Sequence, residues 1–190
     1  MFNKMGKYSA LCGSSLLILM AAANVQAADG EVEFTGSITD GACTITGSSV
    51  KQAVKLPQVR VADFANTVGA TTGKTPFSIS LEDCSTETKK NASITFSGVA
   101  AATDPDVLGM TGENRVGGVG IQIGNKAGEK LALNTASVDH LMTVGSNTFD
   151  FSAAYVRLVA DVPASDGVPA QVNMGTGIVN ALATFDVSYK

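Results

Sequence analysis

Residues 149–155, which read Phe-Asp-Phe-Ser-Ala-Ala-Tyr, predict the central strand of a β-sheet. Side chains two residues apart project to the same face of a strand, so Phe149, Phe151, Ala153 and Tyr155 would form one apolar face. Val156 and Leu158 then take the opposite parity. That change indicates either a bulge or a strand that is covered on both faces.

The same period of two recurs in short segments along the rest of the chain. The segments expected to be extended carry Val54 and Leu56, Phe77 to Leu81, Ile94 and Phe96, Val119 to Ile123, Leu131 and Leu133, and Ala181 to Tyr189. Residues 99–118 between them are rich in Ala, Gly, Asp and Thr and predict a long surface loop. Short strands separated by turn residues predict an all-β sandwich of the immunoglobulin type.

Residues 1–27 have the pattern of a secretory signal peptide. Lys4 and Lys7 precede an apolar run that ends in the small-residue segment Val25-Gln26-Ala27. The run is short for a membrane-spanning helix, although an uncleaved N-terminal anchor is the alternative. Cleavage after Ala27 would leave 163 of the 190 residues, which suits one domain, and no direct membrane insertion is expected.

Two cysteines, Cys43 and Cys84, remain after Cys12 is removed with this segment. An even pair in an exported protein predicts one disulfide bond, and two buried free thiols are the alternative. A metal site is a weaker interpretation, because two cysteines and the single His140 supply too few ligands at the usual spacings. No cofactor is expected.

The charge balance and the polar residues exclude several function classes. After cleavage 11 basic and 17 acidic residues remain, a net charge of −6, which argues against nucleic-acid binding. A hydrolase of the serine type needs a nucleophilic serine beside a histidine base. His140 is the only histidine, and no serine of the chain lies in a nucleophile-elbow context, so no hydrolase site can be named and the chain is not expected to be an enzyme. Asp104 and Asp106 flank Pro105 in a pattern typical of a solvated turn, with weak calcium binding as the alternative.

Residues 28–38 form a separate apolar-alternating segment ahead of Cys43. Val32, Phe34 and Ile38 share one parity, and Gly36 lies between them. This segment could pair within its own sheet, or it could leave its own domain and pair elsewhere. Periodicity by itself favours pairing within the domain.

The sequence resembles the pilin subunits of chaperone–usher fimbriae, and the type 1 major pilins in particular. The resemblance covers essentially all of the 163 residues. It depends on the stretch from Gly30 to Gly36 that leads to Cys43, on Leu56-Pro57-Gln58-Val59, on Leu81-Glu82-Asp83-Cys84, and on the C-terminal pair Gly177 and Tyr189.

The resemblance implies an immunoglobulin-like sandwich that lacks its last strand. Residues 28–38 would be an N-terminal extension that serves as a donor strand, and residues 39–190 would be the pilin domain. The donor residues would be Gly30, Val32, Phe34, Gly36 and Ile38. The acceptor groove and the C-terminal strand would include Gly177, Ala183, Phe185, Val187 and Tyr189.

By the same resemblance, the expected partners are other fimbrial subunits, a periplasmic chaperone and an outer-membrane usher. The protein would pass through the periplasm into a fimbria on the bacterial surface and support cell adhesion. A minor adhesin that binds a carbohydrate or receptor through the loop from Ala100 to Val116 is the alternative function.

Overall fold

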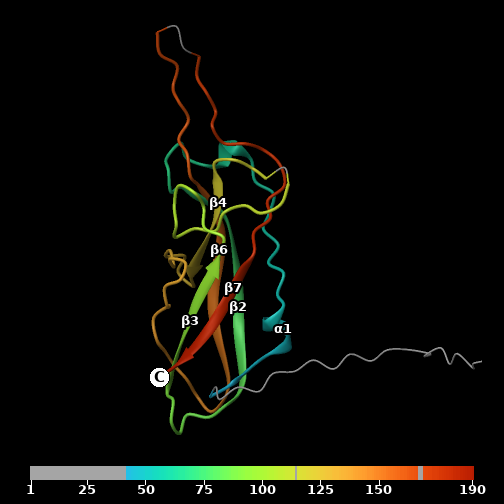
Figure 1. The fold of residues 1–190 in the computed structure, drawn as a ribbon, viewed down its shortest axis with the longest axis vertical. Coiled ribbons are helices and arrows are strands. Elements are labelled where there is room, and N and C mark those ends of the chain that lie inside the picture. The colour runs from blue at the N-terminus through green and yellow to red at the C-terminus, as the bar shows by residue number, and fades with distance from the viewer. Residues whose placement is uncertain (1–41, 114, 167–168) are drawn as a thin grey trace, which may run out of the picture. The chain divides into compact units, whose positions relative to one another are not determined.

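In the computed structural model, residues 42–113, 115–166 and 169–190 are described, and they form two antiparallel sheets (Figure 1). The first sheet has the order β1 (Thr44–Ile45), β2 (Thr71–Cys84), β6 (Gly145–Arg157), β4 (Val119–Asn125). The second has the order β5 (His140–Leu141), β3 (Asn91–Gly98), β7 (Ala183–Tyr189). A single helical turn, α1 (Gly47–Val50), and a short 3-10 turn, η1 (Val61–Asp63), precede β2.

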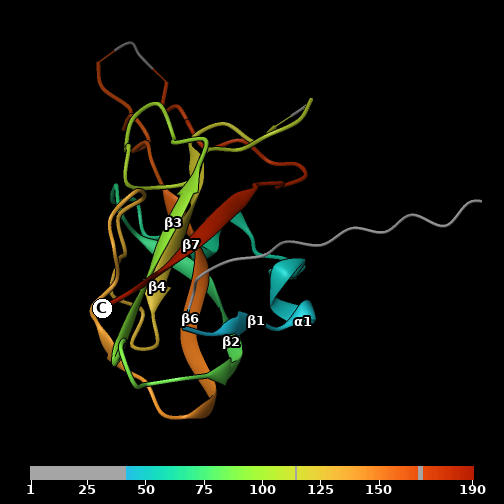
Figure 2. The same cartoon turned by 60° about the horizontal axis from the view of Figure 1, so that its bottom comes forward.

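The two sheets form two layers that cover each other. Figures 1 and 2 show β3 and β7 crossing over the strands β2, β6 and β4. This arrangement confirms the all-β sandwich predicted from the period-two pattern. Residues 151–157 of β6 are buried on both faces, which explains why Val156 departs from the parity of Phe149 and Phe151.

Strand β2 pairs along most of its length with β6, in a register that is interrupted between Thr72 and Thr75. Gly73 lies in this irregularity with φ of 67°, a left-handed conformation that glycine adopts at little cost. A Cβ atom at Gly73 would lie 2.9 Å from the ring of Tyr155. The glycine therefore lets the backbone bend closely over that ring.

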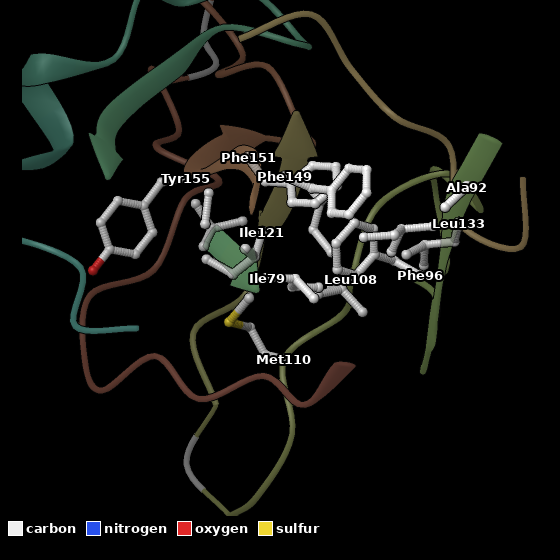
Figure 3. Packing of buried hydrophobic residues seen from close by; sticks show 14 of the residues in the cluster. Ile79, Ala92, Phe96, Leu108, Met110, Ile121, Leu133, Phe149, Phe151 and Tyr155 are labelled. Atoms are coloured by element: carbon white, nitrogen blue, oxygen red, sulfur yellow. The ribbon is translucent and has the colours of Figure 1, made fainter. Parts of the chain in front are cut away.

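Aromatic rings from both sheets meet in the centre of the core. Phe96 of β3 packs against Phe151 of β6 with ring centroids 4.9 Å apart and against Phe77 of β2 at 5.9 Å. Phe185 of β7 lies 6.5 Å from Phe96. Figure 3 shows Phe96 and Leu108 among the buried side chains of the cluster, together with Phe149 and Phe151. These contacts join the sheets, since each ring pair buries a large apolar area.

The predicted disulfide joins Cys43 to Cys84 and defines one end of the sandwich, here named the disulfide end. Strand β3 also begins at this end. The sulfur of Met142 lies 3.6 Å from that of Cys43, and the N–H of Met142 donates to the carbonyl of Lys90, the residue before β3. The opposite end, named the loop end, holds Gly98 and Ala183, which pair where β3 finishes and β7 begins.

Two of the expected strands are absent from the sheets. The segment with Val54 and Leu56 belongs to no ladder, and the segment with Leu131 and Leu133 makes only an isolated bridge through Lys130. Both predictions were wrong because an alternating pattern reports burial on one face, while a ladder also requires a neighbouring backbone. In addition, β7 begins at Ala183 rather than at Ala181.

The prediction of a surface loop at residues 99–118 was also wrong in part. Val107, Leu108 and Met110 are buried in the core. Backbone hydrogen bonds of 3.0 and 2.9 Å join Leu108 to Ile121 of β4. The turn residues of this segment indicate loops correctly, but the side chains of Val107, Leu108 and Met110 fold back into the core.

Candidate functional site

A groove of about 1100 Å³ opens along the sandwich between two segments that are far apart in the sequence. Residues 179–185, at the start of β7, form one wall, and residues 49–56 form the other. The floor is apolar and consists of core side chains of both sheets, namely Phe77, Ile79, Phe96, Leu108, Ile121, Ile123, Ala153 and Tyr155. The groove thus reaches directly into the hydrophobic core.

Strand β7 is an edge strand and pairs only with β3 among the described elements. Asn91 and Lys190 exchange two backbone hydrogen bonds of 2.9 Å, which fixes the alternation of the ladder. In an antiparallel pair, every second residue directs its N–H and C=O away from the partner strand. In the register of β3 and β7, these outward positions are Ala183, Phe185, Val187 and Tyr189.

The opposite wall also has an unpaired backbone. In the part of the chain that the structure describes, no backbone N–H or C=O of residues 51–59 bonds to another backbone group. Side chains hold the segment instead: the hydroxyl of Tyr155 donates to the carbonyl of Pro57 at 3.1 Å, and the amide of Gln52 donates to the carbonyl of Ser78 at 3.3 Å. Burial raises the pKa of Tyr155. The groove therefore lies between two edges that are open to strand addition.

The inward face of β7 is only half-buried. Ala183, Phe185, Val187 and Tyr189 are of intermediate exposure, and each packs against the edge of the core. Burial raises the pKa of Tyr189. On the opposite face of β7, the side chains of Thr184, Asp186 and Ser188 are exposed and polar, so only the face towards the groove offers apolar contact.

Gly177 lies ahead of the groove wall and is exposed, with φ of 149°. The structure thus brings Ala183 and Phe185 into the groove and leaves Gly177 at its approach. Five of the predicted site residues lie outside the described residues: Gly30, Val32, Phe34, Gly36 and Ile38.

The sequence interpretation missed most of the second wall. Ser49 to Leu56 were not proposed as groove residues, and Leu108 was assigned to a surface loop. The apolar pair Val54 and Leu56 was visible in the sequence. Its period of two was consistent with an ordinary strand, and nothing local distinguished a groove wall from a ladder.

The polar residues considered for chemistry do not converge on the groove. His140 packs edge-on against Phe149, with ring centroids 5.0 Å apart. Lys130 bridges Asp104 and Asp106 at 3.4 and 3.1 Å, and this interaction raises the pKa of the lysine. Across residues 42–113, 115–166 and 169–190, no group of three or more His, Cys, Asp or Glu side chains is placed to hold a metal ion.

None of the helices within the described segments is long and apolar enough to cross a membrane.

Residues 32–190 match the family described as fimbrial protein. The chain is 38% identical over 168 residues to the probable major fimbrial subunit LpfA of Escherichia coli O157:H7, which covers 87% of this chain and 86% of that protein. It is 35% identical over 187 residues to the type-1 fimbrial protein A chain of Escherichia coli K12, and the match covers 96% of this chain and 94% of that protein.

Solved structures agree with these relatives. The P pilus rod subunit PapA shares the fold with a TM-score of 0.60 at 18% identity, over 79% of this chain and all of that one. The Burkholderia pseudomallei antigen and type I fimbria protein has a TM-score of 0.56 at 33% identity, over 82% of this chain and 94% of that one. The family match and the identities agree along nearly the whole chain, and the protein belongs to the fimbrial protein family.

Proposed function

We propose that this chain is a structural subunit of a bacterial surface fimbria and that its groove receives residues 28–38 of a neighbouring copy. The observation that carries the proposal is an apolar groove bounded by two unpaired backbone edges, β7 and residues 51–59. An inserted strand would satisfy the outward N–H and C=O groups of β7 and cover the apolar floor of the groove. Strand addition of this kind takes affinity from the backbone and specificity from pockets for alternate side chains.

Residues 28–38 have the pattern that such a groove requires. Val32, Phe34 and Ile38 share one parity and would face the aromatic floor, while the polar residues of the other parity would face water: Glu31, Glu33, Thr35 and Ser37. Burying three such side chains contributes about 5 to 8 kcal/mol before the cost of association is subtracted. Gly30 and Gly36 fit positions where the inserted strand would lie close to a wall.

An unfilled groove of this kind is an aggregation hazard, because it exposes both core and strand edge. A periplasmic chaperone that occupies the groove during export, and an outer-membrane usher that exchanges it for the next subunit, would remove this hazard. Both partners are part of the proposal. Catalysis has no part in it.

Deletion of residues 28–36 tests the proposal. We expect the shortened chain to fold and to be exported, because the described body is left intact, but not to follow another subunit into a fibre. For the complete chain we expect unheated electrophoresis of surface material to show a ladder of non-covalent multimers that collapses on boiling in acid. The deletion variant should lose this ladder. A normal ladder from the deletion variant would contradict the proposal.

The alternative adhesin function places a carbohydrate or receptor site on the loop from Ala100 to Val116. Burial of Val107, Leu108 and Met110 in this segment leaves less of it available for a ligand. Leu108 also lines the groove. Saturable glycan binding by the isolated subunit would favour this alternative.

A further inference from the structure

Two groups of exposed apolar side chains lie at opposite ends of the sandwich. Val99 and Leu182, exposed by 63% and 71%, are the chain neighbours of the paired residues Gly98 and Ala183 at the loop end. With Ile178, which is 76% exposed and lies four residues before Leu182, they make up what we name the loop-end patch. Leu141 and Val144 are exposed by 77% and 76% and form the disulfide-end patch. Exposed apolar side chains that gather in one place commonly mark an interaction surface.

Hydrogen bonds fix the backbone beneath the loop-end patch. The N–H of Gly109 donates to the carbonyl of Val99 at 2.8 Å, and the N–H of Thr111 donates to the carbonyl of Asn180 at 2.8 Å. Leu182 also lines the groove. The patch is therefore continuous with the groove that receives the donor strand.

The disulfide-end patch is likewise fixed to the sheets. Leu141 pairs with Asn91 at the start of β3, and Val144 precedes Gly145, which pairs with Cys84. The described chain also enters the sandwich at this end, because Thr44 pairs with Glu82 near the disulfide.

The direction of an inserted strand decides which ends of two copies meet. Every pair in the sheet of β5, β3 and β7 is antiparallel, and purely antiparallel sheets are favoured over mixed ones. A strand added antiparallel to β7 would run from the disulfide end of the acceptor to its loop end. Its C-terminal residue, Ile38 of the donor, would then lie near the acceptor's loop-end patch.

The link between Ile38 and the donor's own body is short. Four Cα steps join Ile38 to Ala42, and an extended chain covers at most about 14 Å in that number. Since Ala42 lies at the disulfide end of the donor, that end must approach the loop end of the acceptor.

We propose that the loop-end patch of one copy packs against the disulfide-end patch of the next, as a second contact beside the inserted strand. This inference rests on the proposed function. The contact is heterologous, since two different surfaces meet, and repetition of such a contact produces an open filament. The patches are small, but the short link raises their effective concentration, so a weak contact can set the angle between successive copies.

Chemical cross-linking of fibres tests this contact in the full chain. Leu182→Cys and Leu141→Cys are introduced together, and assembled fibres are treated with a short bis-maleimide, which joins two thiols by thioether bonds. Cys43 and Cys84 are already bonded to each other and do not react. We expect covalent multimers that survive boiling in acid.

The matched control pairs Leu182→Cys with Ala127→Cys, because Ala127 is exposed in the turn after β4, the edge strand of the other sheet. Fibres that carry only one of these cysteines measure how much cross-linking occurs between the same residue of two copies. Proximity should give the Leu182, Leu141 pair at least about tenfold more covalent multimer than the control pair.

An equal yield from both pairs, or none from either in fibres that assemble normally, would overturn the end-to-end contact and leave the proposed function intact. If the unsubstituted chain forms no multimers, the proposed function itself fails.

Discussion

Arg157 shows how one buried charge organises the loop that follows β6. Its side chain is 2% exposed, its Nε donates to the carbonyl of Val159 at 2.7 Å, and its guanidinium meets the carboxylate of Asp161. Asp161 also accepts the N–H of Asn173 at 2.9 Å. The backbone bond from Asn173, together with the Arg157 guanidinium, lowers the pKa of Asp161. This network connects the two sides of the loop at its base.

Asp161→Asn should therefore lower the melting temperature at pH 7. A carboxyl group whose pKa is depressed by folding stabilises the protein above its ordinary pKa of 3.8, and this stabilisation is lost as pH falls through the folded value. The difference between the variant and the parent in thermal denaturation should shrink as the pH falls below 3.8. Asp166→Asn, on the same loop, is the control and should have little effect. A difference that persists unchanged in acid would contradict a role for the charge.

Substitution of Phe151 tests how much the aromatic contacts of the core contribute to stability. The side chain is 2% exposed and contacts both Phe96 and Phe77. Phe151→Ala should reduce the free energy of unfolding by about 3 to 5 kcal/mol, because it removes apolar burial and leaves a cavity. Urea denaturation measures this change. Val138→Ala, at a residue exposed by 73%, should stay within about 0.5 kcal/mol of the parent.

At the scale of an element, β7 has two faces with different roles. Val187 packs against the edge of the core on the groove side, whereas Ser188 is exposed on the other side. Adjacent residues of one strand can thus receive the same substitution on opposite faces.

Val187→Arg should abolish fibre assembly, while Ser188→Arg should retain it. Val187 shares its face of β7 with Phe185, which lines the groove, so a guanidinium on this face would oppose an inserted apolar strand. Both substitutions change the net charge equally. Unheated electrophoresis of surface material reports assembly. Protease resistance of the exported subunit shows whether each variant still folds. Equal assembly by two folded variants would argue against insertion beside β7.

At the scale of the whole molecule, the disulfide compensates for a sandwich whose core is open along one groove. It closes a loop with a sequence separation of 41 residues and joins the segment that enters β1 to the end of β2. Both sulfur-bearing residues are buried.

Replacement of Cys43 and Cys84 by alanine should reduce the free energy of unfolding by about 4 kcal/mol, on the model in which a cross-link restricts the unfolded chain. Denaturant unfolding of the parent in the presence and absence of a thiol reductant gives an independent measurement. A loss below about 1 kcal/mol in both experiments would show that the open sandwich is stable without the cross-link.

The sequence by itself determined the period-two strands, the central strand at Phe149 to Tyr155 and the pairing of Cys43 with Cys84. These features are local, or depend on a count of two cysteines, so neighbouring residues are sufficient to predict them. Only the tertiary structure decided that Leu56 lies in a groove wall rather than a ladder, and that Leu108 turns inward to the floor. The tertiary structure also decides which backbone groups of β7 point away from β3. This depends on the register with β3, whose residues are about 90 positions away in the sequence. Whether an edge is filled or vacant depends on which distant segments meet it, and a local apolar pattern is the same in both cases.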